Sequence, residues 1–224
     1  MDRWSYARDL FDEHFEPLRA AGYELGRLPD APSYWKQHEA EMREHFPPEV
    51  FFELHALRSA HEKDGQARLA ATRAGEPLRD FTVVRRDGEL VAMFSGEQKT
   101  DGMYRMWHTN VHSEHRRRGI YGLIVRGTIA YTRALGFDTI TSEHAPCNNN
   151  VLIAKMRAGF RIYAMEVDPM AGMSIILRYF HNPEHLAAYE LRCGLATLTP
   201  RLRAHGFGAF STFRDQVAGK VEPV

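Results

Sequence analysis

The sequence has little cysteine and no excess of charge. Only Cys147 and Cys193 occur in 224 residues, which is too few for a disulfide scaffold and typical of a reduced, cytoplasmic protein. Lysine plus arginine and aspartate plus glutamate number 29 each, so the formal net charge is zero. A general binder of nucleic acids or membranes would need a basic excess. We therefore expect neither kind of partner.

Signals for metals and for targeting are also lacking. No Cys-x-x-Cys or His-Glu-x-x-His motif occurs, and the twelve histidines are scattered, so we expect no metal site. The nearest approach to one is the pair His112 and His115. Residues 1–17 carry acids and lack the apolar centre of a signal peptide, and no apolar run reaches the length of a membrane span. With 44% hydrophobic and 26% charged residues, the composition predicts a globular, cytoplasmic protein.

The first 78 residues predict a helical N-terminal part. Apolar residues recur at helical spacing, and glycines and prolines separate the segments. The expected helices cover residues 6–18, 33–46, 47–64 and 66–73.

Residues 79–182 predict a core that contains a sheet. The Asp87-Gly88 pair between two apolar runs is a strong hairpin signal. Strands are expected at 81–86, 89–95, 103–111, 137–142, 160–167 and 173–179, with helices at 120–135 and 151–158. Residues 183–224 are expected to form a C-terminal extension with a helix at 184–193, and we expect residues 1–224 to be one domain.

The stretch 105–137 organises this core. It begins as a strand, turns through His-Ser-Glu-His-Arg-Arg-Arg-Gly and leaves as an amphipathic helix. The first amides of a helix have no internal partners, and the helix dipole places partial positive charge there. Gly119 lets an anion approach the backbone, and the arginines at 116–118 add cationic donors. The stretch therefore predicts an anion site.

Two blocks of residues resemble a known family. Arg116-x-x-Gly119-x-Tyr121 resembles the acyl-CoA signature of the GNAT superfamily of N-acyltransferases, which is Arg or Gln, two residues, Gly, one residue, then Gly or Ala. Tyr121 departs at the last position, and Gly122 follows one step later. The second block runs from Asn148 to Phe160 and resembles the family's Asn, helix, basic residue, Gly and Phe. Lys155 stands where the family often has a Tyr that can protonate the departing CoA sulfur.

The resemblance implies an α/β fold with a mixed, mostly antiparallel central sheet of about six strands between helices. The sheet should be splayed between the strand that ends near Val111 and the strand that starts near Phe137. The implied activity is direct transfer of an acyl group, which we expect to be acetyl, from acyl-CoA to an amine of a small molecule or protein. A non-catalytic acyl-CoA sensor or regulatory module is the alternative. Either function leaves a homodimer possible.

The same resemblance assigns the cofactor site. The loop should bind the pyrophosphate through main-chain N–H groups, and the central strand should offer main-chain partners to the pantetheine arm. Asn148 either caps its helix or touches that arm. The implied cofactor-binding residues are Asn110, Val111, Arg116, Arg117, Arg118, Gly119, Ile120, Tyr121, Gly122 and Asn148.

The general base is the open question. Some family members place Glu or His on the central strand, where this chain has Arg105 and Trp107. His108 and Glu143 are the candidates, and a structural role is the alternative for each. A chain of waters is a further alternative. Cys147 could carry the acyl group covalently, but direct transfer without an acyl-enzyme is the expectation.

Overall fold

The computed structural model describes residues 3–45, 77–100, 102–169 and 172–195. The helices expected at 47–64 and 66–73 lie outside these residues. The chain divides into two compact units, Met1–Tyr179 and Phe180–Val224, and the first contains residues 79–179 of the expected core, which extends to residue 182.

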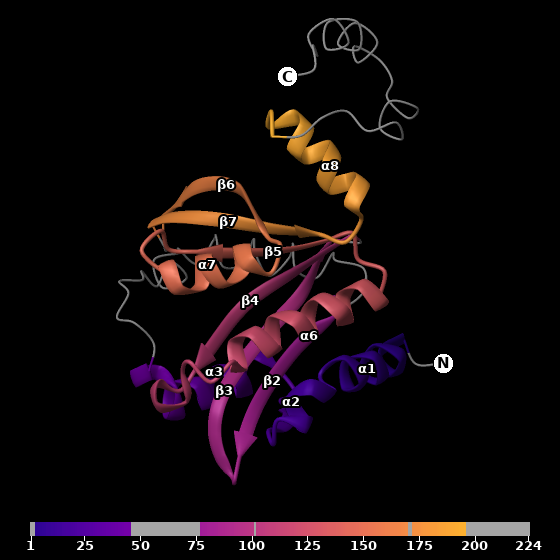
Figure 1. Cartoon of the computed structure of the whole chain (residues 1–224). Coiled ribbons are helices and arrows are strands. Elements are labelled where there is room, and N and C mark those ends of the chain that lie inside the picture. Colours follow the sequence, from indigo (N-terminus) through magenta and orange to yellow (C-terminus); the bar gives the residue numbers. More distant parts are fainter. Residues whose placement is uncertain (1–2, 46–76, 101, 170–171, 196–224) are drawn as a thin grey trace, which may run out of the picture. The chain divides into compact units, whose positions relative to one another are not determined.

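The first unit is built on a sheet with strand order β1-β2-β3-β4-β5-β7-β6 (Figure 1). The pairs β1–β2, β2–β3, β3–β4 and β6–β7 are antiparallel, whereas β4 and β5 run parallel. The strands are β1 (Glu24–Arg27), β2 (Arg79–Arg86), β3 (Glu89–Thr100), β4 (Met103–Val111), β5 (Thr139–His144), β6 (Arg161–Asp168) and β7 (Gly172–Phe180). The predicted mixed, mostly antiparallel sheet is confirmed, with seven strands among the described residues in place of about six.

The additional strand, β1, corrects the expectation of a purely helical N-terminal part. Its four residues pair with β2 in the register Glu24 to Arg85 through Arg27 to Thr82. The strand is short, contains Gly26 and shows no clear alternation of apolar residues. Pairing with the edge of β2 forms this strand, which local sequence pattern does not predict.

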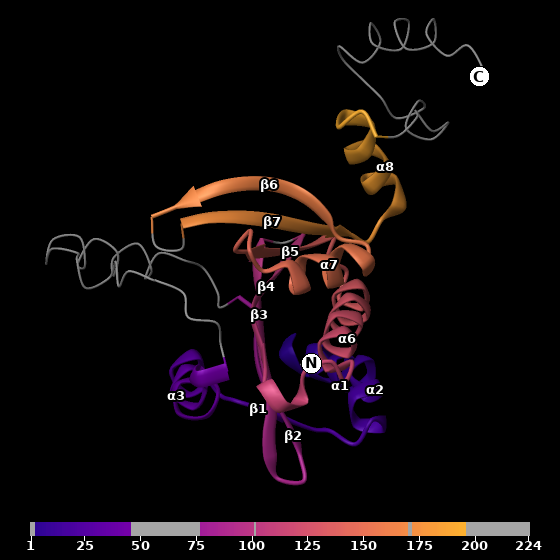
Figure 2. The same ribbon diagram turned by 60° about the vertical axis from the view of Figure 1, so that its left-hand side comes forward.

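Helices cover the two faces of the sheet (Figure 2). On one face lie α1, α2 and α6, and on the other lies α3, which packs on β2. The helices of this unit are α1 (Arg3–His14), α2 (Glu16–Ala20), α3 (Ala31–Glu41), α6 (Ile120–Ala134) and α7 (Asn149–Arg157), with 3-10 turns η1 (Arg43–His45) and η2 (Ser113–His115).

The larger core lies under α1 and α6 and has an aromatic centre. Phe11 and Phe15 stack with ring centroids 4.2 Å apart, and Phe15 stacks on Phe94 of β3 at 5.2 Å. Gly127 of α6 is required here, because an added Cβ would lie 2.9 Å from the Phe15 ring. This close approach fixes α6, and therefore the loop that precedes it, against the sheet.

Strands β4 and β5 pair over only three residues and then separate. The register pairs Met103, Tyr104 and Arg105 with residues 139–141, and β4 continues to Val111 without β5 beside it. A β-bulge at Trp107, between the pairs Gly96–Met106 and Ser95–His108, bends β4 at this point. The predicted splay is confirmed, and we call the space between the diverging strands the wedge.

The second unit contains α8 (Pro183–Arg192) among its described residues. The Asn182 side chain caps the helix by accepting the Glu184 N–H at 2.9 Å. Within the described parts of both units, no helix is long and apolar enough to cross a membrane.

Candidate functional site

The loop between β4 and α6 has the backbone of an anion site. Arg117 has φ +61° and Gly119 has φ +84°, two left-handed residues separated by one. Gly119 is the N-cap of α6, and no side chain caps the helix. The first amides of α6 therefore face outward without a capping acceptor. An added Cβ on Gly119 would meet no atom within 4 Å, so the space before the helix is open.

The three arginines of the loop differ in role. Arg116 donates from Nε to the Val111 carbonyl oxygen at 3.1 Å and from a terminal nitrogen to the His45 carbonyl oxygen. It therefore ties η1 to the end of β4. Arg117 and Arg118 are exposed, and within the described residues the side chain of neither forms a hydrogen bond or an ion pair. These two guanidinium groups are the ones available to a bound anion.

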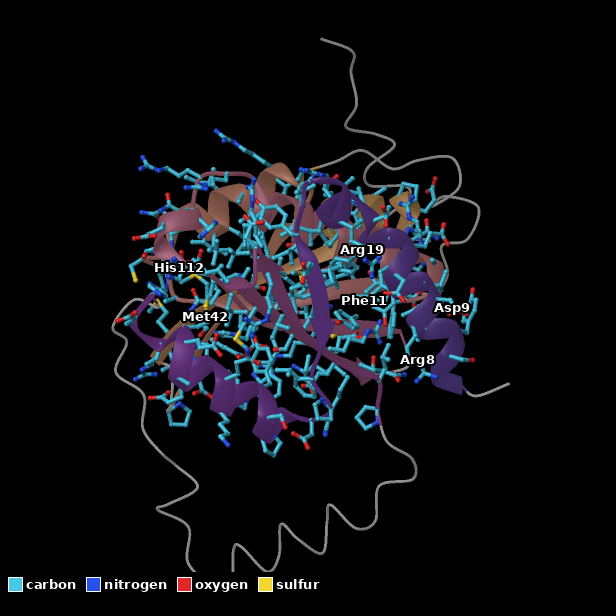
Figure 3. All side chains as sticks on the ribbon, turned by 90° about the horizontal axis from the view of Figure 1, so that it is seen from below. Arg8, Asp9, Phe11, Arg19, Met42 and His112 are labelled. Carbon is cyan, nitrogen blue, oxygen red and sulfur yellow. The ribbon has the colours of Figure 1, made fainter. Side chains whose placement is uncertain are left out.

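The same junction brings η1 beside the loop. The rings of His45 and His112 lie 3.6 Å apart between centroids, and Figure 3 shows Met42 and His112 on the same side of the molecule. Asn110 is buried, and its side-chain amide donates to the Met42 carbonyl oxygen at 3.0 Å. Its side chain therefore holds α3 to β4.

The edge of β4 in the wedge offers main-chain groups. The His112 N–H donates to the Val91 carbonyl oxygen of β3 at 2.9 Å. Peptide groups alternate in direction along a strand, so those of Thr109 and Val111 face the wedge and those of Asn110 face β3. The Val111 carbonyl already accepts from Arg116. The Thr109 groups and the Val111 N–H thus remain for a ligand in the wedge.

Helix α7 borders the wedge, and Asn148 is its N-cap residue. The Asn148 side chain makes no capping hydrogen bond, so the expected capping role is wrong. Its φ of −80° and ψ of 59° are not the extended values typical of a capping asparagine, which explains the missing bond.

One side chain of α7 is a buried amine. Lys155 is 1% exposed, and its Nζ lies 3.2 Å from Sδ of Met106 and 4.7 Å from the centre of the Phe160 ring. Burial lowers the pKa of Lys155 from 10.5 to about 7. Among the described residues no carboxylate forms an ion pair with Lys155, so no acidic side chain in that part of the chain compensates the charge of its ammonium group.

Glu143, at the end of β5, is held by two cations. Arg105 donates to its carboxylate at 2.6 Å, and Lys99 Nζ lies 3.9 Å from the other oxygen. Arg105 also lies 4.0 Å from Glu97 on β3. Arg105 therefore pairs with acids in this structure, and one oxygen of the Glu143 carboxylate already accepts a strong hydrogen bond.

His108 lies on the opposite side of β4 from Lys155, beneath α3. Its Nδ1 and the Tyr34 hydroxyl are 2.6 Å apart. Burial, and then the nearby His38, lower the pKa of His108 to about 3, so its imidazole is neutral near pH 7. Burial raises the pKa of Tyr34 above its ordinary value, so the phenol keeps its proton. When that proton is donated to Nδ1, Nε2 carries the other hydrogen and cannot act as a base.

Two tryptophans lie beside His108 and reach the surface. Trp35 of α3 is 37% exposed and Trp107 of the bulge is 41% exposed. Their rings are 6.0 Å apart and nearly perpendicular, and Trp35 is 5.1 Å from the His108 ring. The bulge turns Trp107 and His108 toward the same face, which creates an open aromatic wall next to the wedge.

A possible metal-ligand group lies at the other end of β4. Glu89, His112 and His115 each offer a ligand atom within 4.8 Å of the others. His115 Nε2 lies 3.5 Å from the Glu89 carboxylate, and His112 Nδ1 accepts the Glu114 N–H at 3.3 Å. These contacts join β3 to the loop and explain why the three side chains lie together. That the protein has no metal site remains a prediction.

A shallow apolar pocket lies away from this chemistry. It runs along the C-terminal half of α6, between His14 and Tyr179. Neither the loop nor the wedge contributes to it, and we assign it no role in catalysis.

The structure thus brings together residues that sequence reasoning had left apart. The contribution of α3 to the aromatic wall, through Trp35, was not predicted, because α3 carries no motif. Lys155 was noted only as a departure from Tyr. A signal for its burial was present, since Lys155 lies three residues after the buried Leu152 on one helix face.

Comparison with known proteins identifies the family. The family model described as "Acetyltransferase (GNAT) family" matches residues 31–160. This range is more than half of the chain and contains the loop, the wedge and α7. No curated protein sequence matches the chain.

Solved structures resemble the chain at low identity. The ribosomal-protein-S18-alanine N-acetyltransferase from Escherichia coli is 13% identical, with 70% of this chain and 93% of that chain covered and a TM-score of 0.49. A GNAT family acetyltransferase from Elizabethkingia anophelis, solved with acetyl-CoA bound, is 9% identical, with 71% and 98% covered and a TM-score of 0.49. At these levels the likeness adds nothing to the family match. Because that match spans most of the core and includes the loop that opens α6, the protein belongs to the GNAT family of acyl-CoA-dependent N-acetyltransferases.

Proposed function

We propose that the protein holds acetyl-CoA with the pyrophosphate on residues 116–122 and transfers the acetyl group directly to an amine in the wedge. The supporting observation is that an uncapped helix start, at Gly119, lies where β4 has left β5. A pyrophosphate favours helix amides, and the amide-containing pantetheine arm suits the open main-chain edge of β4. A single ligand, acetyl-CoA, therefore accounts for both the uncapped start of α6 and the open main-chain edge of β4.

The residues of the loop then have separate tasks. The amides of Ile120, Tyr121 and Gly122 bind the phosphates, and Arg117 and Arg118 supply charge. Arg116 and Asn110 act indirectly, because their side chains fasten η1 and α3 to β4. The Val111 N–H is positioned to bind the arm or to polarise the thioester carbonyl. Asn148, whose side chain makes no capping hydrogen bond, contacts the pantetheine arm in this proposal.

Glu143 and His108 remain the candidates for the general base, acting directly or through water. Glu143 lies at the end of β5 and retains an oxygen that Arg105 does not bind. The low pKa of His108 makes its imidazole a weak base. These contacts favour Glu143 of the two.

The acceptor amine enters, in this proposal, along the aromatic wall on the α3 face. Exposed tryptophans bind ammonium groups and apolar substituents through their ring faces, and Trp35 and Trp107 are both open to solvent. The charges of Arg105, Glu97 and Glu143 lie on the same face. An amine with an attached apolar group, on a small molecule or on a protein, fits this combination.

The experiment that tests the cofactor site compares two glycines of one helix. Gly119 begins α6 with φ +84° and Gly136 follows its end with φ +88°, and an added Cβ meets nothing within 4 Å at either place. Gly119→Ala and Gly136→Ala therefore impose the same backbone strain, about 1–2 kcal/mol. Only Gly119→Ala puts a methyl group where the pyrophosphate would meet the amides.

Calorimetric titration with acetyl-CoA reads the difference. We expect Gly119→Ala to weaken binding at least tenfold, about 1.4 kcal/mol, and Gly136→Ala to bind like the parent. Thermal unfolding should give the two variants similar losses of stability. Equal acetyl-CoA affinity in both variants would mean that the loop is not part of the cofactor site and that the proposed mechanism is wrong.

We also propose that the protein works in the cytoplasm as a homodimer joined along β6. This edge strand exposes Ile162, Tyr163, Met165 and Val167, the last of them 77% exposed. An antiparallel pair of two β6 strands centred between residues 164 and 165 sets Arg161 opposite Asp168 at both ends. The charged and apolar residues of one β6 strand are then complementary to those of the same strand in the second copy, as a two-fold interface requires.

A further inference from the structure

The amine of Lys155 is unusual because it is buried and no carboxylate pairs with it among the described residues. It is 1% exposed and touches a thioether and an aromatic ring. Burying an ammonium group without a partner is costly, and an apolar residue in its place is usually as stable or more so. A buried amine of this kind, next to the space between two diverging strands, therefore indicates a functional group.

Its position is at the narrow end of the wedge. Arg105 is the last residue of β4 that pairs with β5, and Met106 is the next. Lys155 Nζ lies 3.2 Å from the Met106 sulfur, so the amine lies where the two strands begin to diverge. A cofactor arm that enters from the loop end of the wedge and runs along β4 ends in front of this amine.

The other titratable side chains near the wedge are buried and neutral, hydrogen-bonded to another side chain, or exposed at the surface. His144 of β5 faces Lys155, and burial followed by repulsion from Lys155 lowers its pKa to about 3. Its imidazole is therefore neutral. The Glu143 carboxylate accepts from Arg105, and Cys147 is exposed. Arg157, the other cation of α7, is exposed as well.

We propose that Lys155 gives its proton to the CoA sulfur as the thioester breaks. This rests on the proposed placement of acetyl-CoA in the wedge. The acceptor nitrogen bonds to the carbonyl carbon and loses a proton to the base or to water. The carbon–sulfur bond then breaks, its electron pair stays on sulfur, and a proton passes from Lys155 Nζ to give the CoA thiol. The neutral amine regains a proton from solvent.

The electrostatics favour this step. An ammonium ion beside the sulfur stabilises the departing thiolate before the proton moves. Burial brings the pKa of Lys155 to about 7, close to the ordinary value of about 8.5 for a thiol. The amine and the thiol therefore have similar proton affinities, and the free energy of proton transfer between them is not strongly unfavourable in either direction.

The test uses CoA itself and needs no acceptor. The thiolate absorbs in the ultraviolet, so a pH titration of the complex with CoA gives the thiol pKa in the bound state. We compare the parent with Lys155→Met, which keeps the length of the side chain and removes its charge. Arg157→Met on the exposed side of the same helix is the matched control.

We expect the bound thiol in Lys155→Met to ionise at least tenfold less readily than in the parent, with Arg157→Met like the parent. The acetyl-CoA dissociation constant should stay within about threefold in both variants, a change of about 0.6 kcal/mol. The same thiol pKa in parent and Lys155→Met would overturn the proposal. If the parent does not bind CoA, the cofactor site itself has failed, which is a different result.

Discussion

The clearest consequence of the buried amine concerns stability. Lys155→Met should make the protein more stable at neutral pH while it impairs the proposed proton transfer. The substitution removes an ammonium group that forms no ion pair among the described residues, and it leaves an apolar chain of similar length against Met106 and Phe160. Most core substitutions destabilise a protein, so a gain is a distinctive result.

The size of the gain follows from the two pKa values of the lysine. The native value is about 7 and the unfolded value is 10.5, and each unit is worth about 1.4 kcal/mol. Below pH 7 the amine is therefore expected to cost the native state about 5 kcal/mol. Met should recover much of this amount.

The sign of the pH dependence is fixed by the lowered native pKa. Between pH 7 and 10.5 the unfolded chain binds the proton more than the native chain does, so the stability of the parent rises with pH. The difference between Lys155→Met and the parent should therefore shrink, from about 5 kcal/mol near pH 6 to about 2 kcal/mol near pH 9. Ionisation of His108 is common to both proteins and largely cancels. His144 loses the repulsion from Lys155 in the variant, which relieves part of the lowering of its pKa and adds to the gain at low pH.

Urea unfolding followed by circular dichroism at several pH values measures this difference. The slope of the free energy against urea concentration should be the same in both proteins, since the surface exposed on unfolding is nearly unchanged. A gain that does not vary with pH would mean that Lys155 stays protonated in the native state. A loss of stability near pH 6 would mean that the amine has a compensating partner. Either result would refute the reasoning.

Three other predictions concern the loop, the base and the edge strand. Arg116→Ala should lower the free energy of unfolding by about 1–3 kcal/mol, because it removes the donor to two backbone carbonyls, whereas Arg118→Ala should leave unfolding unchanged and weaken acetyl-CoA binding about tenfold or more in calorimetry. Of Glu143→Gln and His108→Ala, the variant that removes the base should lose acetylation of the acceptor amine at unchanged acetyl-CoA affinity, and full turnover in both variants would exclude both residues. Val167→Lys should convert a homodimer to a monomer in sedimentation experiments, with Tyr6→Lys on α1 as an exposed control; a monomeric parent would disprove the interface.

The left-handed backbone of Gly119 shows where prediction from the sequence was incomplete. The pattern from Val111 to Gly122 identified the loop, because a strand, a glycine and a helix in this order can be predicted from neighbouring residues alone. The same pattern did not predict that Gly119 has a left-handed φ. A β-branched residue at that position would test backbone strain as much as binding, and for this reason Gly136 is needed as a control.

The resemblance to the GNAT signatures implied the family and the splay of the sheet, and local pattern by itself determined the strands from β2 to β7 and the hairpin at Asp87-Gly88. These depend on local periodicity, on turn residues and on short motifs, which act within a few residues of one another. The tertiary structure alone decided that β1 is a strand, that Arg116 fastens η1, that Arg105 neutralises Glu143 and that Lys155 is buried. Each of these is a contact between residues far apart in the chain, and the balance of desolvation, charge and hydrogen bonding at such contacts exists only after the elements have packed.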